Sequence, residues 1–195
     1  WKEAHRTLGS DPVFGPLVRE VGPVTVPRAT GGPFPYLVRA IVYQQLAGAA
    51  ARTIHGRFVE ALGGRITPEA VLDAPEETLR GAGLSGNKLK AVRDLAEKVR
   101  SGEVAVADLA ERSDEEVEVR LTRVWGIGPW TAQMFLMFHL HRPDVWPAGD
   151  LGVRQGYAHL HGLGQPVQEG EMAARGDAYR PWRSAAAWYC WRALE

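Results

Sequence analysis

Cysteine is nearly absent from this chain of 195 residues, which contains only Cys190. A single cysteine cannot close a disulfide within the chain. It also cannot supply the several thiolates that a cysteine-based zinc site or an iron–sulfur cluster requires. The sequence has no apolar run long enough to span a membrane and no secretory signal near its beginning. We therefore expect a cytoplasmic protein without a membrane partner.

An excess of charge of either sign is also lacking, because 23 Lys and Arg residues balance 23 Asp and Glu residues. This balance argues against a protein that bulk charge alone holds on nucleic acid. The charges are unevenly distributed, however: residues 80–100 are mainly basic, and residues 103–118 are mainly acidic. A local DNA-facing side is compatible with this pattern, and two ordinary solvated helix faces are the alternative.

The sequence also lacks any sustained alternation of apolar and polar residues, so we predict an all-α fold. Ser113 to Glu116 form a capping box that opens one predicted helix, and a buried helix is predicted from Trp130 to Leu140. Between them lie Gly126, Ile127 and Gly128. Two glycines permit unusual backbone conformations and bare the amides at the start of the second helix, which is a favourable place for a phosphate. A plain close helix crossing would have the same glycines.

Four segments together resemble a known superfamily. They are VWGIGPWTA…DVWPAGDLGVR, IVYQQLAGAAARTI, GLSGNKLKAVRDLA and YRPWRSAAAWYCWRALE. This set resembles the helix-hairpin-helix DNA glycosylases, and within them the AlkA-type 3-methyladenine DNA glycosylases (DNA-3-methyladenine glycosylase II). The likeness covers about Asp11 to the end and implies the compact form, without an N-terminal β-rich domain.

The resemblance implies a two-lobed helical fold with the DNA site in the cleft between the lobes. We expect lobe one at approximately 1–35 plus 150–195 and lobe two at approximately 36–149, with the hairpin at 114–140. We expect a monomer, nucleoid-associated if the protein is bacterial. No cofactor is expected to be required, and a structural Na⁺ or K⁺ ion is expected at the hairpin.

The resemblance also implies roles for individual residues. Asp150 would be the catalytic aspartate. The amides of Gly126, Gly128 and Trp130 would bind a DNA phosphate, and the carbonyls of Thr122, Val124 and Ile127 would hold the monovalent cation. Leu46, with Gln45, would be the wedge that fills the gap left by a flipped nucleotide. Trp130, Trp191, Met134 and Tyr43 would line the base pocket.

The chemistry of glycosidic cleavage independently favours a carboxylate at position 150. Breaking the bond between base and sugar builds positive charge on the sugar, which a nearby carboxylate stabilises. Asp150 follows the flexible Pro-Ala-Gly segment 147–149 and precedes a predicted helix, so a simpler role as helix N-cap is also available to it. Asp144 is the rival carboxylate, and we interpret it as structural because it lies before that loop.

Lysine is missing where bifunctional members of the superfamily use it. Those relatives carry a lysine two residues after the second hairpin glycine, whereas this chain has Trp130 there and no lysine after Lys98. Without the amine that forms a Schiff base, we predict a monofunctional enzyme that leaves an abasic site. An indole face also suits cationic alkylated bases. The expected partner is double-stranded DNA with alkylated bases of the 3-methyladenine or 7-methylguanine type.

Two other functions remain open at this point. A superfamily relative could act on oxidised or mismatched bases, and a non-catalytic module could bind damaged DNA without releasing a base. The second alternative requires Asp150 to be a helix cap and nothing more.

Overall fold

A computed structural model describes residues 1–26 and 31–195 of the chain. Residues 27–30, which belong to the expected first lobe, lie outside the described part. Throughout the described ranges the regular structure is helical and contains no strand, which confirms the all-α prediction. No helix in these ranges has both the length and the apolarity of a membrane span.

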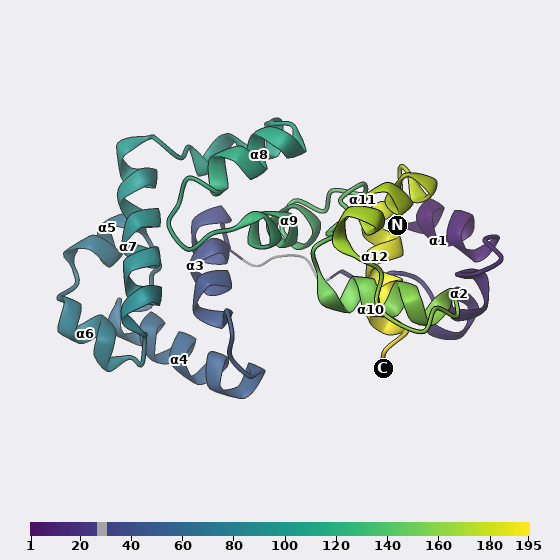
Figure 1. The fold of residues 1–195 in the computed structure, drawn as a ribbon. Helices are drawn as coiled ribbons and strands as arrows, with labels where there is room; N and C mark the ends of the chain where they lie inside the picture. The colour runs from purple at the N-terminus through teal and green to yellow at the C-terminus, as the bar shows by residue number, and fades with distance from the viewer. Residues whose placement is uncertain (27–30) are drawn as a thin grey trace. The chain divides into compact units, whose positions relative to one another are not determined.

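Two compact units share the chain (Figure 1). One unit consists of Trp1–Pro27 together with Leu136–Glu195, and the other of Arg28–Phe135. The first unit is therefore discontinuous in sequence, as the expected first lobe is. Its second segment begins inside a helix at Leu136, and not at the loop before Asp150. Helical hydrogen bonding continues through this point, so no break in the local sequence pattern marks it.

The continuous unit contains the segments that build the hairpin. Its helices are α3 (Pro33–Tyr43), α4 (Gly48–Ala61), α5 (Pro68–Asp73), α6 (Glu76–Gly81), α7 (Gly86–Ser101), the 3₁₀ helix η1 (Val106–Glu111), α8 (Asp114–Leu121) and the first part of α9 (Pro129–Phe138). Helix α7 packs against α3, α5 and α6. Its side chains Leu89, Val92 and Leu95 are buried, as the amphipathic spacing predicts. Burial of each such side chain contributes about 1.5–3 kcal/mol.

The discontinuous unit contains α1 (Lys2–Gly9), α2 (Gly15–Val21), α10 (Leu151–Leu160), α11 (Glu169–Arg175), η2 (Gly176–Tyr179) and α12 (Arg183–Arg192). Helices α10 and α12 form its main contact (Figure 1). They cross so closely at Gly156 that an added Cβ would clash with the Cys190 carbonyl group. This crossing fixes the start of α10, where Asp150 lies, against the C-terminal helix.

Candidate functional site

The hairpin is formed by α8, the Gly-Ile-Gly turn and α9. The predicted capping box is confirmed, because the Ser113 hydroxyl accepts a hydrogen bond from the Glu116 amide and the Glu116 carboxylate accepts one from the Ser113 amide. In the turn, the Ile127 amide donates to the Val124 carbonyl at 3.0 Å. Both Val124 and Ile127 are buried, so the turn is anchored by its apolar side chains.

The two turn glycines serve different purposes. Gly126 has a φ of +83°, and an added Cβ would lie 3.0 Å from the Cβ of Ala91 on α7. Both the backbone conformation and the close packing therefore require glycine at position 126. An added Cβ at Gly128 would meet nothing within 4 Å. The open space at Gly128 allows another molecule to approach the backbone at the start of α9.

Two side chains from other helices hold the turn. Gln44, directly after α3, donates through Nε2 to the Gly126 carbonyl at 3.0 Å and to Thr131 Oγ1 at 3.3 Å. Asp94 of α7 accepts the Trp125 amide at 2.7 Å and pairs with Lys98 at 2.7 Å. Burial alone would raise the pKa of Asp94, but the hydrogen bonds from Lys98 and the Trp125 amide outweigh it and lower the pKa.

The aromatic residues of the hairpin do not follow the expected burial. The apolar spacing before the turn predicts one helical stripe of Val117, Leu121, Val124 and Trp125. Val117, Leu121 and Val124 are buried, but Trp125 is 41% exposed, with the Lys90 ammonium 4.4 Å from its ring centroid. Trp125 therefore does not share the burial of the stripe, because α8 ends at Leu121 and Trp125 lies in the turn that follows. Trp130 is 49% exposed, so the first turn of α9 also departs from the buried helix that was predicted.

The predicted wedge residues lie in the short turn between α3 and α4. Gln45 has a φ of +56°, a left-handed conformation that costs a residue with a side chain about 1–2 kcal/mol. Leu46 is 37% exposed, and its amide donates to the Tyr43 carbonyl at 3.3 Å. Backbone strain of the kind at Gln45 is concentrated at functional sites.

Other predicted pocket residues of this unit lie on α3 and α9. Met134 is half-buried, and its carbonyl accepts the Tyr36 hydroxyl at 3.3 Å. Tyr43 is half-buried, with the Arg39 guanidinium 4.7 Å from its ring centroid. One face of Tyr43 therefore already contacts a cation, which the sequence does not reveal.

Asp150 caps helix α10, as its position before the predicted helix suggests. Its Oδ1 accepts the Val153 amide at 2.8 Å and the Trp191 indole Nε1–H at 2.9 Å. The Trp191 ring packs against Phe138 with 5.8 Å between ring centroids. An added Cβ at Gly152 would lie 2.9 Å from the Trp191 ring, so the glycine after Leu151 makes room for this indole. The two donors fix one carboxylate oxygen.

Asp144 is bound by two arginines. Its carboxylate accepts hydrogen bonds from Arg183 and Arg180, each at 2.7 Å, and Arg183 also reaches its carbonyl oxygen at 2.7 Å. Ser184 adds a bond to the Val145 amide at 2.9 Å. These contacts tie the segment before Asp150 to α12, which supports the structural interpretation of Asp144.

The predicted site residues divide between the two units. The phosphate-binding, cation-binding and wedge residues belong to Arg28–Phe135, together with Trp130, Met134 and Tyr43. Asp150 and Trp191 belong to the unit that contains Leu136–Glu195, where they are directly bonded. A base pocket with walls from both units stays a prediction.

Several basic residues of the segment 80–100 bind the protein itself. Lys88 donates to the Val42 carbonyl at 2.7 Å, and Arg93 donates to the Ala74 carbonyl at 2.7 Å. Lys98 pairs with Asp94. These three residues therefore make structural contacts, which neither a DNA-facing side nor an ordinary solvated helix face predicts.

Sequence reasoning missed the contributions of Gln44, Asp94 and the indole N–H of Trp191. Their partners lie 82, 31 and 41 residues away along the chain. Gln44 adjoins the predicted wedge, and this proximity was the only local signal available for any of the three.

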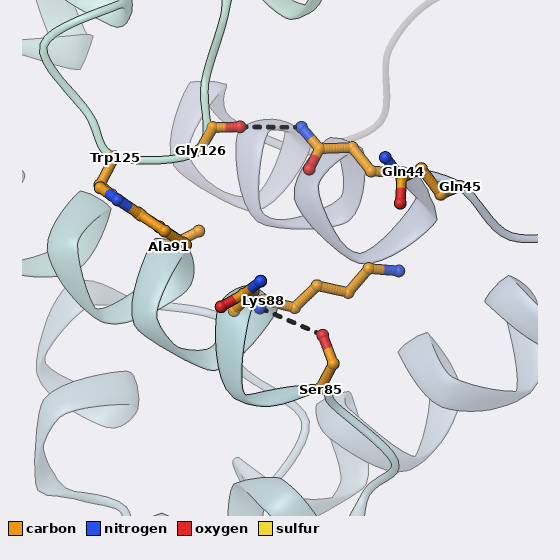
Figure 2. A pocket seen from close by; sticks show the side chains of 8 residues that line it. Gln44, Gln45, Ser85, Lys88, Ala91, Trp125 and Gly126 are labelled. Carbon is orange, nitrogen blue, oxygen red and sulfur yellow. Dashed lines mark hydrogen bonds between the residues drawn. The ribbon is translucent and has the colours of Figure 1, made fainter.

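A pocket of about 220 Å³ opens beside the hairpin turn (Figure 2). It lies between Gln44 and Gln45, the first turn of α7, and Trp125 with Gly126. Figure 2 shows the Gln44 amide directed at the Gly126 carbonyl, which joins two walls of this pocket.

Comparison with known proteins agrees with this geometry. Residues 38–181 match the HhH-GPD superfamily of base excision DNA repair proteins. The chain is 39% identical to DNA-3-methyladenine glycosylase 1 of Schizosaccharomyces pombe over 189 residues, which cover 94% of this chain and 83% of that protein.

Two solved structures share the fold over nearly the whole chain. The structure of the 3-methyladenine DNA glycosylase Mag1 of Schizosaccharomyces pombe, in complex with abasic DNA, is 36% identical with a TM-score of 0.87, and the match covers 97% of this chain and 95% of that one. The DNA-3-methyladenine glycosidase of Bacillus halodurans is 35% identical with a TM-score of 0.88, covering 97% and 88%. With its helical hairpin, its Gly/Pro-rich loop and the aspartate that caps α10, the chain belongs to the HhH-GPD superfamily of base excision DNA repair proteins.

Proposed function

We propose that this protein is a monofunctional DNA glycosylase of base excision repair. It binds double-stranded DNA, flips out an alkylated base of the 3-methyladenine or 7-methylguanine type, and hydrolyses the N-glycosidic bond to leave an abasic site. The observation that carries the proposal is the Asp150 carboxylate, which accepts hydrogen bonds from the Val153 amide and the Trp191 indole. The similarity to DNA-3-methyladenine glycosylase 1 supports the substrate class.

Asp150 acts by stabilising charge. When the bond between the sugar C1′ and the base nitrogen breaks, its electron pair leaves with the base and the sugar becomes an oxocarbenium-like cation. The carboxylate stabilises this cation and orients a water, whose oxygen bonds to C1′ while one of its protons is released. A cationic alkylated base leaves as a neutral molecule, so this reaction needs no strong general acid. The Val153 amide and the Trp191 indole fix the carboxylate before substrate arrives.

The hairpin binds the DNA backbone in this proposal. The amides of Gly126, Gly128 and Trp130 receive a phosphate, which the positive end of the α9 dipole also favours. The open space around Gly128 supports a close approach of the phosphate to the backbone. The carbonyls of Thr122, Val124 and Ile127 would hold Na⁺ or K⁺. The donor chemistry fits, because the Val124 carbonyl accepts one amide and a carbonyl oxygen has two lone pairs.

Flipping a base out of the duplex costs a few kcal/mol, which an inserted side chain offsets by filling the gap. Leu46, with Gln45, would be this wedge. The exposure of Leu46 and the left-handed backbone of Gln45 support the assignment.

Trp130 defines the reaction type and contributes to the base pocket in this proposal. An indole cannot form a Schiff base, so the enzyme would release the base by hydrolysis without cutting the strand. Trp130, Trp191, Met134 and Tyr43 would surround the base, and the indole faces would favour a cationic ring. The large exposed surface of Trp130 supports a role in contacting a ligand.

Base release from a panel of single-lesion duplexes tests the proposal. We expect the wild type to release 7-methylguanine and 3-methyladenine and to leave an abasic strand that stays uncut until alkali is added. We expect Asp150→Asn to release neither base. Asparagine keeps the side-chain oxygen that caps α10 but removes the charge. Release of 8-oxoguanine or mismatched bases instead would indicate the oxidised-base alternative. Tight binding to abasic DNA without any release would indicate a non-catalytic module, and wild-type release by Asp150→Asn would overturn the assignment of Asp150.

A further inference from the structure

The turn that carries the predicted wedge residues Gln45 and Leu46, here called the wedge turn, is joined to the hairpin turn by hydrogen bonds from a side chain. Gln44 immediately precedes the wedge residues and donates to the Gly126 carbonyl at 3.0 Å and to Thr131 Oγ1 at 3.3 Å. An amide nitrogen carries two hydrogens, so one group binds the turn before α9 and the first turn of α9 itself. Thr131 is buried, which limits the movement of this connection.

Helix α7 completes the connection on the other side. Lys88 of α7 donates to the Val42 carbonyl at 2.7 Å, which holds the last turn of α3 just before the wedge. Burial lowers the pKa of Lys88, which is consistent with an ammonium used inside the structure. Asp94 of the same helix holds the Trp125 amide at 2.7 Å. The end of α3, helix α7 and the hairpin turn therefore form a closed triangle of side-chain-to-backbone bonds.

Among the three bonds of this triangle, only the one from Gln44 joins the wedge turn directly to the hairpin. Gln44 acts from a turn in which the next residue, Gln45, has a left-handed backbone. A strained turn relaxes unless neighbouring contacts hold it. Because the amide of Gln44 is directed at Gly126 (Figure 2), it holds the turn from inside the protein.

We propose that Gln44 is a positioning residue that couples the wedge to the phosphate-binding turn of the hairpin. This inference rests on the proposed function, since it assigns how that function's two DNA-contacting parts keep their spacing. A phosphate held at the hairpin fixes the DNA backbone, and Gln44 fixes the wedge relative to that point. Binding of the phosphate therefore places the wedge where it can enter the base stack and open the damaged base pair. Loss of the two hydrogen bonds leaves both parts present but lets their spacing vary.

The coupling predicts a selective defect. A wedge is needed when the lesion is paired and stacked, and it is needed much less when the lesion faces an abasic analogue, because opening an unpaired base costs less. We expect Gln44→Met, which keeps the length of the side chain without its donor, to slow release of 7-methylguanine from a fully paired duplex about tenfold or more. This corresponds to about 1.4 kcal/mol. From a duplex with tetrahydrofuran opposite the lesion, its rate should stay within about threefold of wild type.

A matched control is Gln133→Ala. Gln133 belongs to α9 and reaches the Glu118 carboxylate of α8 at 3.5 Å, so it is a glutamine of the same hairpin without a bond to the wedge turn. This variant should behave as wild type on both duplexes. Equal losses on both duplexes in Gln44→Met would show a general structural role and overturn the proposal. Unchanged rates on both duplexes would overturn it as well.

A binding experiment separates this inference from the proposed function. A duplex with a tetrahydrofuran site and an adjacent 2-aminopurine reports insertion of the wedge by a change in fluorescence, without any base release. At saturating protein, the wild type and Gln133→Ala should give the full change, and Gln44→Met a reduced one. If the wild type releases no base but this difference is seen, the proposed reaction fails and the coupling stands. Equal changes in all three proteins overturn the coupling.

Discussion

Replacement of Trp191 by phenylalanine isolates the hydrogen bond that fixes Asp150. The substitution removes the indole N–H, which donates to Asp150 Oδ1 at 2.9 Å, and keeps an aromatic ring beside Phe138. Asp150 retains the bond from the Val153 amide at 2.8 Å, so the cap of α10 stays in place. Without the indole donor, the carboxylate is held less firmly in its orientation.

The expected size of the effect follows from the type of bond. A hydrogen bond to a charged group contributes about 1.5–3 kcal/mol. If the bond fixes the carboxylate for the transition state, this range corresponds to a fall in kcat of about ten- to hundredfold. Both residues are half-buried, so the lower part of the range is expected. The KM should change little, because the bond acts on the reacting charge and not on binding of the duplex.

Single-turnover release of 7-methylguanine by Trp191→Phe measures the effect. Trp188→Phe is the matched control, since Trp188 lies on the same helix and packs its ring against Tyr189 and Arg192. A wild-type rate in Trp191→Phe, together with a large loss in Trp191→Leu, would refute the reasoning. That result would mean that Trp191 contributes its ring to the base pocket and not its N–H to Asp150.

Three further outcomes are expected. Asp150→Ala removes both the cap of α10 and the acceptor for the Trp191 indole, which costs about 2–3 kcal/mol of stability and lowers the melting temperature by roughly 4–12 °C. The melting temperature of Asp150→Asn should stay near that of the wild type. Equal melting temperatures for the two variants in calorimetry would contradict this. Gly128→Ala should fold normally yet bind abasic duplex more weakly, because its Cβ enters open space where a phosphate would approach. Gly126→Ala should lose stability, because Gly126 has a φ of +83°. Binding titrations and thermal melts separate the two effects. Burial, with the Arg175 charge adding to it and Asp11 opposing it, lowers the pKa of His161 from 6.5. The unfolded chain therefore binds more protons just below that pH, so stability should fall as pH decreases from about 7.5 to about 5.5, and it should fall less in His161→Phe; an unchanged slope in that variant would exclude this source.

The second glycine-containing turn shows what local signals can establish. The segment from Arg80 to Ser85 predicts a weaker helix–turn–helix pair, and the structure has α6, a turn with Gly83 at a φ of +102°, and α7 capped by the Ser85 hydroxyl. Caps, prolines and glycines act over a few residues, so a sequence reveals them directly. Gly48 predicts a break in the helical spacing of residues 34–62, and the structure has a break between α3 and α4 just before Gly48.

Local signals were less successful where a contact between distant segments decides the structure. Trp125 belongs to an apolar stripe by spacing, yet the turn exposes it. The predicted last helix begins at Pro181, but α12 begins at Arg183. Val106–Glu111 forms a 3₁₀ helix that the sequence did not indicate. Trp125 follows the end of α8, and the start of α12 is also a helix end, where neighbouring groups compete with the intrinsic preference of a few residues.

The sequence alone determined the all-α fold class, the hairpin with its two glycines, the position of Asp150 before a helix and the replacement of lysine by Trp130. Each of these depends on residue type and near spacing, which act through local backbone geometry. Only the tertiary structure revealed that the Trp191 indole holds Asp150, that Asp94 holds the hairpin turn and that Gln44 joins this turn to the wedge. A hydrogen bond between residues far apart in sequence depends on how the helices pack, and no periodicity or motif in the chain records that packing.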